Sequence, residues 1–230
     1  MQNHSDEFYK LDKKIINCHK CNRLVKWREK TALEKTKRFS NWDYWGKPVT
    51  GFGDIQARLW IVGLAPAAHG VNRTGRMFTG DRSGDFLYRA LFKAGFANQP
   101  KSVNKNDGLI LKESFISALV RCAPPVNKPT KQEFSNCQPY LEEEFQLLKN
   151  MQIILCLGQL SYSHIMKMLE SMVKVNYKPS SKFHHGLELE LSLKLRLITS
   201  YHPSQQNTFT GKLTEKMLDD VFDRINYLLA

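Results

Sequence analysis

The chain of 230 residues carries 34 lysines and arginines against 22 aspartates and glutamates, and a formal net charge of +12 favours a polyanionic partner such as nucleic acid. Its length predicts one domain, residues 1–230, built around one sizeable core. The sequence has no apolar run of about 18 residues that would span a membrane and no signal peptide, and its five cysteines are expected to stay reduced in the cytoplasm.

The first part of the chain combines a helical pattern with a pair of cysteines. An amphipathic helix is predicted over residues 5–16, and Cys18 and Cys21 follow it directly. Two further cysteines, Cys122 and Cys137, come much later in the chain. Two widely separated pairs suit a structural zinc or an iron–sulfur cluster, although zinc ribbons usually repeat the tight spacing in both halves. Spacing alone favours such a centre over a redox pair or unrelated cysteines and leaves iron and zinc open.

Residues 23–58 interleave aromatic and basic side chains. Aromatic rings among lysines and arginines could stack on nucleobases. The interpretation that we prefer is a satellite hydrophobic cluster that covers the sheet. The aromatic residues concerned are Trp27, Phe39, Trp42, Tyr44 and Trp45.

Apolar, β-prone segments alternate with helical patterns through the rest of the chain. Strands are predicted at residues 59–64, 114–120, 153–158 and 195–200, with an edge strand or hairpin arm at 187–193. Thr130 and Glu133 form a capping box that opens a helix running to about residue 150. Cys156 falls within a strand pattern and is assigned to the core. The alternation predicts an α/β fold of three layers, with a central four-stranded parallel sheet flanked by helices.

The loops that leave the carboxyl ends of these strands carry polar side chains that could take part in binding or catalysis. In open α/β sheets ligands bind at this edge, so residues far apart in the sequence can converge there. The phosphate-loop, Rossmann, serine-hydrolase and zinc-protease motifs are all missing from the sequence. The converging candidates are His69, Arg73, Phe78, Asp81, Asn127 and His202.

Three of these loops carry specific motifs. The first runs Gly-Leu-Ala-Pro-Ala-Ala-His-Gly from Gly63 and ends Phe-Thr-Gly-Asp at Asp81; the others are Arg-Cys-Ala-Pro-Pro from Arg121 and His-Pro-Ser from His202. Together they resemble family 5 (type B) uracil-DNA glycosylases. The resemblance implies a monofunctional glycosylase that hydrolyses the N-glycosidic bond of flipped-out uracil in DNA and so begins base excision repair. It also implies a [4Fe–4S] cluster on Cys18, Cys21, Cys122 and Cys137.

The resemblance and the chemistry of the reaction together imply roles for individual side chains. Asp81 is expected to position the attacking water and to stabilise the cationic sugar, helped by Asn127, and its structural alternative is the N-cap of the next helix. His202 is expected to donate a hydrogen bond to the base carbonyl where negative charge develops. Substrate contacts are expected from Gly63, Ala65, Phe78 and Ala118, with Phe78 stacking on the base. DNA contacts are expected from His69, Arg73, Lys128, Ser204 and Asn207.

The sequence also departs from better-studied members of the superfamily. Those carry Asp or Glu where this chain has Leu64 and Ala65, and many carry Asn where it has Ala118. The losses predict a broad specificity that extends to thymine opposite guanine, hypoxanthine and ethenocytosine. The expected partner is double-stranded or single-stranded DNA with damaged bases, and the enzyme is expected to be a monomer. Two alternatives stay open: a non-catalytic Fe–S or zinc module that binds DNA, and a strictly uracil-specific family 4 glycosylase, whose first motif carries Glu at the position of Leu64.

Overall fold

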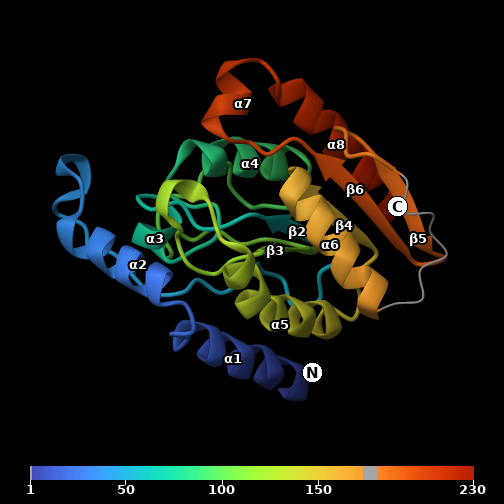
Figure 1. Ribbon diagram of the computed structural model, residues 1–230. Coiled ribbons are helices and arrows are strands. Elements are labelled where there is room, and N and C mark those ends of the chain that lie inside the picture. Colours follow the sequence, from blue (N-terminus) through green and yellow to red (C-terminus); the bar gives the residue numbers. More distant parts are fainter. Residues whose placement is uncertain (1, 173–180) are drawn as a thin grey trace.

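The structure of the protein, a computed structural model, describes residues 2–172 and 181–230 (Figure 1). The sequence of residues 171–186 is polar and predicts no regular element, and residues 173–180 of it lie outside this description. The strands are β1 (Phe52–Gly53), β2 (Leu59–Gly63), β3 (Ser114–Ala118), β4 (Ile153–Leu157), β5 (Glu188–Ser192) and β6 (Leu195–Ser200). The helices are α1 (Gln2–Ile16), α2 (Asn22–Glu34), α3 (Val71–Thr74), α4 (Arg82–Lys93), α5 (Lys131–Leu147), α6 (Gln159–Met172), α7 (Gln205–Phe209) and α8 (Glu215–Leu229), with 3-10 turns η1 (Lys37–Phe39) and η2 (Pro125–Asn127).

One sheet of six strands, in the order β1-β3-β2-β4-β6-β5, forms the middle of the molecule. The four central strands are parallel, which confirms the predicted core of the sheet. The two edge strands are antiparallel to their neighbours, so the complete sheet is mixed. β5 is the predicted edge strand, whereas β1 is too short, at two residues, to leave a pattern in the sequence.

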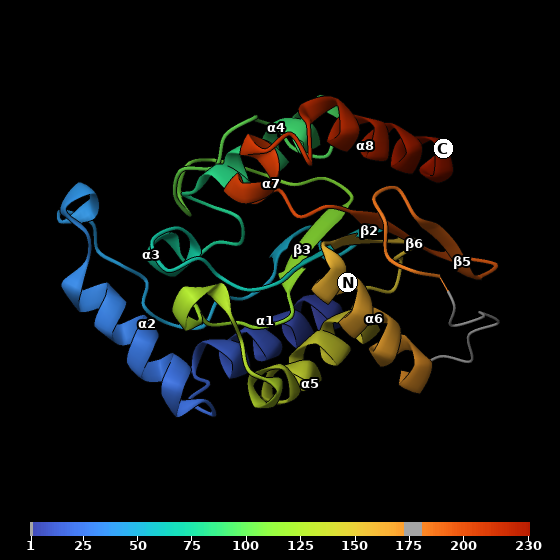
Figure 2. The ribbon, with the colours of Figure 1, turned by 45° about the horizontal axis from the view of Figure 1, so that its top comes forward.

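Helices cover both faces of this sheet. Helices α4 and α8 pack on one face, and α1, α5 and α6 pack on the other (Figures 1 and 2). The strands β2, β3 and β4 are buried at every position, because a parallel sheet covered on both sides offers no solvent-facing side. Cys156 is fully buried in β4, as its pattern predicts. Among the described residues, no helix has the length and apolar character needed to cross a membrane.

Helix α5 begins with the predicted capping box. The Thr130 hydroxyl accepts from the Glu133 amide, and the Glu133 carboxylate accepts from the Thr130 amide at 2.7 Å. The same carboxylate pairs with Arg23 of α2 at 2.7 Å. Helix α2 was not predicted, and this ion pair fixes it against the start of α5.

Candidate active site

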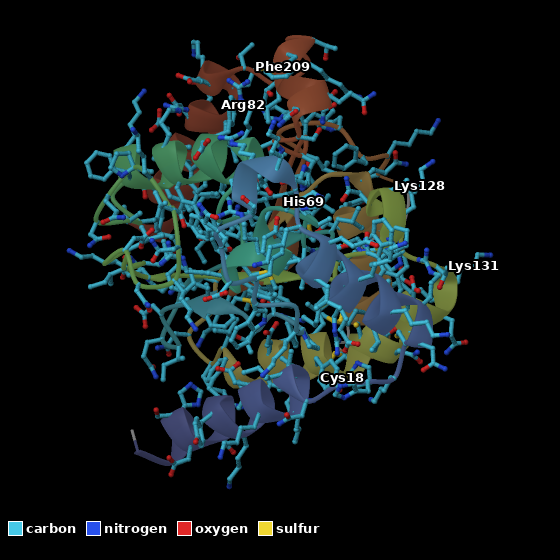
Figure 3. All side chains as sticks on the ribbon, turned by 90° about the vertical axis from the view of Figure 1, so that its left-hand side faces the viewer. Cys18, His69, Arg82, Lys128, Lys131 and Phe209 are labelled. Atoms are coloured by element: carbon cyan, nitrogen blue, oxygen red, sulfur yellow. The ribbon has the colours of Figure 1, made fainter. Side chains whose placement is uncertain are left out.

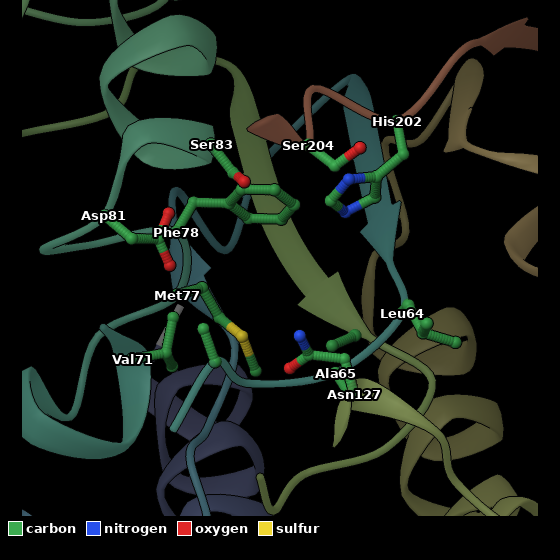
Figure 4. A pocket seen from close by; sticks show the side chains of 12 residues that line it. Leu64, Ala65, Val71, Met77, Phe78, Asp81, Ser83, Asn127, His202 and Ser204 are labelled. Atoms are coloured by element: carbon green, nitrogen blue, oxygen red, sulfur yellow. The ribbon is translucent and has the colours of Figure 1, made fainter. Parts of the chain in front are cut away.

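The loops that leave β2, β3 and β6 surround a cavity of about 290 Å³, which we call the central cavity. This volume lies at the lower end of the roughly 300–1,000 Å³ that is usual for small-molecule sites. Phe78, Asp81, Asn127 and His202 all face it, as the sequence predicts (Figure 4). The other lining residues are Leu64, Ala65, Ala67, Val71, Met77, Ser83, Ala118 and Ser204.

Phe78 forms one wall of the central cavity. Its ring lies directly against β2, since a Cβ added at Gly63 would come within 2.8 Å of it. Gly63 therefore does not line the cavity but makes space for the aromatic wall. Phe78 also has a φ of 51°, a left-handed conformation that is unusual for an aromatic residue. Such local strain persists where the surrounding structure holds it in place, as at many binding sites.

Asp81 has two structural roles that coexist. One carboxylate oxygen accepts from the amide of Gly84 at 3.1 Å, so Asp81 is the N-cap of α4, the structural alternative considered from the sequence. The carboxylate nevertheless faces the central cavity (Figure 4). Its second oxygen lies so near Gly70 that a Cβ there would come within 2.3 Å. Desolvation raises the pKa of Asp81 above its usual range, and the charge of Arg73 partly opposes this rise.

His202 stands across the central cavity from Asp81. Its ring is 5.9 Å from that of Phe78, centroid to centroid, and neither ring nitrogen has a hydrogen-bond partner within the described chain. Burial lowers the pKa of His202 to about 4, so the imidazole is neutral at physiological pH and keeps one N–H donor. The carbonyl of His202 accepts from the Asn207 side chain at 2.9 Å, which braces the loop.

Asn127 reaches the rim of the central cavity from a strained turn. Val126 and Asn127 both have left-handed φ angles, 49° and 55°. A β-branched residue such as Val126 is rarely found in this conformation. The turn exposes the Val126 side chain to solvent and brings the Asn127 amide to the cavity, opposite His202 (Figure 4).

The remaining predicted DNA-contacting residues divide into accessible and enclosed ones. Lys128 is exposed, and His69 is half-buried, with its Nδ1 3.1 Å from the Tyr44 hydroxyl. Ser204 lines the cavity and caps α7. Arg73 is only 4% exposed, so its side chain is enclosed in this structure, and its contact with DNA stays a prediction. The side-chain amide of Asn207 donates to the carbonyl of His202, and its contact with DNA stays a prediction.

Sequence reasoning missed several residues that line the cavity. Val71, Met77 and Ser83 complete its walls beside the predicted Ala65 and Ala118. No pattern in the sequence distinguishes these three residues, so only the position of the first motif pointed toward them.

The four predicted cysteines lie around a second, much smaller cavity, the cysteine cavity, on the side of the molecule where α2 meets α5. Its lining includes Cys18, Cys21, Cys122 and Cys137, and Figure 3 marks Cys18. No three His, Cys, Asp or Glu side chains in the described ranges are arranged to hold a single metal ion. Burial raises the pKa of Cys122 to about 12 and that of Cys137 to about 11.

Two buried cations stand beside these sulfurs. Arg28, 1% exposed, donates from Nη1 to the sulfur of Cys122 at 3.1 Å. Arg121 is equally buried, pairs with Glu144 and has two nitrogens without a hydrogen-bond partner among the described residues. A buried cation normally needs a compensating anion. Four cysteine sulfurs with buried cations beside them are a donor set that an anionic metal centre would fit.

The loops of a sheet with a parallel centre thus gather an aromatic wall, a carboxylate and a neutral imidazole at one cavity, as an α/β enzyme does. The chain belongs to the uracil DNA glycosylase superfamily, whose family model matches residues 50–226. It is similar to the type-5 uracil-DNA glycosylase of Mycobacterium leprae, with 50% identity over 92% of this chain and 91% of that protein. The type-5 enzyme of Thermus thermophilus is 43% identical over 90% and 91%. The type-4 enzyme of Pyrobaculum aerophilum is 29% identical over 86% and 83%.

Proposed function

We propose that this protein removes uracil from DNA by hydrolysing its N-glycosidic bond, the first step of base excision repair. The observation that carries the proposal is one cavity that Phe78, Asp81 and His202 share. A base inside a duplex is out of reach of any such cavity, so the nucleotide must first be flipped out, at a cost of a few kcal/mol. The cavity of about 290 Å³ suits a single base rather than a larger ligand.

His202 serves the departing base in this mechanism. Cleavage of the glycosidic bond leaves negative charge on the uracil carbonyl, which a fixed donor in a dry site stabilises strongly. The neutral His202 ring can supply that N–H, and its nitrogens have no competing partner among the described residues. Phe78 stacks on the base and holds it in the plane that this hydrogen bond requires.

Asp81 serves the sugar. The ionised Asp81 carboxylate, across the cavity from His202, stabilises the oxocarbenium-like sugar and orients the attacking water. The Asn127 amide is the second contact to this water. The residues that line the cavity include no lysine, so no amine is placed to attack the sugar. This favours hydrolysis by water, hence a monofunctional glycosylase. A non-catalytic DNA-binding module would have no use for the three side chains together.

A broad substrate range follows from how little of the cavity is polar. Leu64, Ala65 and Ala118 present no hydrogen-bonding side chain to the edge of a base. A site without such groups rejects related bases weakly. Excision of thymine opposite guanine, hypoxanthine and ethenocytosine is therefore expected besides that of uracil. A strictly uracil-specific enzyme of the family 4 type would need a polar group at the position of Leu64.

A panel of oligonucleotides tests this proposal. Purified protein, incubated with single-stranded and double-stranded DNA that carries one modified base, is expected to leave alkali-labile sites at uracil and, more slowly, at the other three bases. No cleavage at uracil would contradict the glycosylase function itself, and cleavage at uracil alone would contradict only the broad range.

We also propose that Cys18, Cys21, Cys122 and Cys137 hold a [4Fe–4S] cluster. The four thiols around one cavity and the buried cation Arg28 support it. The cluster would anchor α2 and the start of the chain to α5, a structural role.

Iron analysis tests the cluster. Anaerobically purified protein is expected to contain about four irons per chain and to absorb in the visible region. Cys137→Ser should lose most of the iron and lower the thermal midpoint. Cys156→Ala is the matched control, since this fifth cysteine is buried in β4 away from the cysteine cavity, and it should keep its iron. Stoichiometric zinc without iron would contradict the proposal.

The DNA contacts are assigned to the face that carries the loops. His69, Arg82, Lys128 and Lys131 are labelled on the side of the molecule that Figure 3 shows. Phosphate contacts from such side chains position the duplex and make binding weaken with salt. We propose that the protein acts on this DNA as a monomer in the cytoplasm, where its cysteines, all free in the described chain, stay reduced.

A further inference from the structure

Arg73 joins the two ends of the loop that supplies Phe78 and Asp81. Its Nε donates to the carbonyl of His69 at 2.8 Å, and its Nη2 donates to the carbonyl of Gly80 at 2.9 Å. His69 precedes the segment and Gly80 ends it, directly before Asp81. The contact is close, since a Cβ at Gly80 would come within 2.5 Å of Nη2. The planar guanidinium thus spans the loop as a brace.

A segment from elsewhere in the chain encloses this brace. The guanidinium carbon of Arg73 lies 3.9 Å from the ring centroid of Phe39 and 4.1 Å from that of Trp42. Both rings belong to the stretch that follows α2, from η1 onward. Aromatic faces stabilise a guanidinium at such distances and shield it from water. The same stretch donates from the Trp45 amide to the carbonyl of Arg73 at 3.0 Å.

We propose that Arg73 is a positioning residue, held by Phe39 and Trp42, that sets the separation of His69 from Gly80 and thereby places Phe78 and Asp81 around the flipped base. The inference rests on the proposed glycosylase function. We prefer this role to a contact with a DNA phosphate because the Arg73 side chain is enclosed and two of its three nitrogens already donate hydrogen bonds.

The chemistry of the side chain explains why the position needs arginine. Two carbonyls in different directions require a rigid fork of donors, and the delocalised cation of arginine suits contact with aromatic rings. A lysine could keep the charge but not the fork of donors. Arg73 also lowers the pKa of Asp81. The other groups that act on Asp81 are Asp85, which raises this pKa, and the amides of Ser83 and Gly84, which lower it, while His202 is neutral across the cavity.

The test separates chemistry from DNA binding. Single-turnover excision of uracil from a duplex with a U·G pair measures the chemical step, and binding of a duplex with the cleavage-resistant 2′-fluoro-2′-deoxyuridine measures affinity. Arg73→Met is expected to slow excision about 10²-fold, as displaced catalytic groups do, with Kd within about twofold and the slope of log Kd against log salt unchanged. The acid limb of its rate profile should move to higher pH. Arg73→Lys should also be slow.

Further variants guard against simple misfolding. Trp42→Ala should reproduce the slow excision in part, and Trp42→Phe should restore it. Arg58→Met is the control, because Arg58, directly before β2, also donates to a backbone carbonyl but does not line the central cavity; it should leave rate and pH profile unchanged. A weaker Kd with a salt slope reduced by about one, or a full rate in Arg73→Lys, would overturn the proposal. If the wild-type protein does not excise uracil, the proposed function fails instead.

Discussion

Replacement of His202 by alanine is expected to slow uracil excision about 10²–10³-fold, the usual cost of removing one fixed donor to a developing negative charge. The imidazole lines the central cavity and has no hydrogen-bond partner within the described chain. Single-turnover rates on a U·G duplex measure the loss. Affinity for an uncleavable duplex should change little, because the hydrogen bond gains most of its strength as the bond breaks.

The low pKa of His202 gives this prediction a second, independent readout. The neutral ring is present at all pH values above about 4, so its titration should leave no step in the wild-type rate between pH 5 and 8. The unfolded chain, with an ordinary His pKa, takes up a proton below about pH 6.5, which the folded chain does not do until about pH 4. The free energy of unfolding should therefore decrease as the pH is lowered from about 6.5 to about 4, and it should decrease less in His202→Ala. An unchanged rate in His202→Ala would remove this residue from the mechanism.

The regular core of the fold was predictable because its strands and most of its helices follow simple patterns. The central strands are buried on both faces, so their sequences are continuous apolar runs. The capping box of Thr130 and Glu133 indicates the start of α5. Helix α2 was not predicted because its buried side includes the polar residues Arg28 and Thr31, which break the apolar pattern of an amphipathic helix. Arg28 turns inward to the sulfur of Cys122, a partner that no local pattern reveals.

The candidate site was predictable in its members but not in their states. The first and last motifs pointed to Phe78, Asp81 and His202, and the loops bring all three to one cavity. The enclosure of Arg73 could not be foreseen, because an arginine in a polar loop usually faces solvent. Only the fold brings Phe39 and Trp42 into contact with it. Similarly, the neutral state of His202 depends on burial, a property of the assembled loops.

Asp81→Asn is expected to lower the excision rate by about 10²–10⁴-fold, the range for a positioned acid–base group, without loss of stability. Asparagine is as good an N-cap as aspartate, so the hydrogen bond from the Gly84 amide is kept. Asp81→Ala should lose the rate equally and in addition about 0.5–2 kcal/mol of stability, since alanine cannot cap α4. Thermal midpoints and single-turnover rates of the two variants therefore separate the cap from the chemistry.

The direction of the Asp81 pKa shift sharpens the comparison. Because desolvation raises this pKa in the folded chain, the folded state binds the proton more readily than the unfolded state, and stability from this group is lost as pH rises through the raised pKa. At neutral pH the ionised carboxylate thus opposes folding, and Asp81→Asn should melt at the same temperature as the wild type or higher. Excision by the wild type should fall as pH drops through the same pKa, because the ionised form does the work. An Asp81→Asn variant that excises uracil at the wild-type rate would reduce Asp81 to a helix cap.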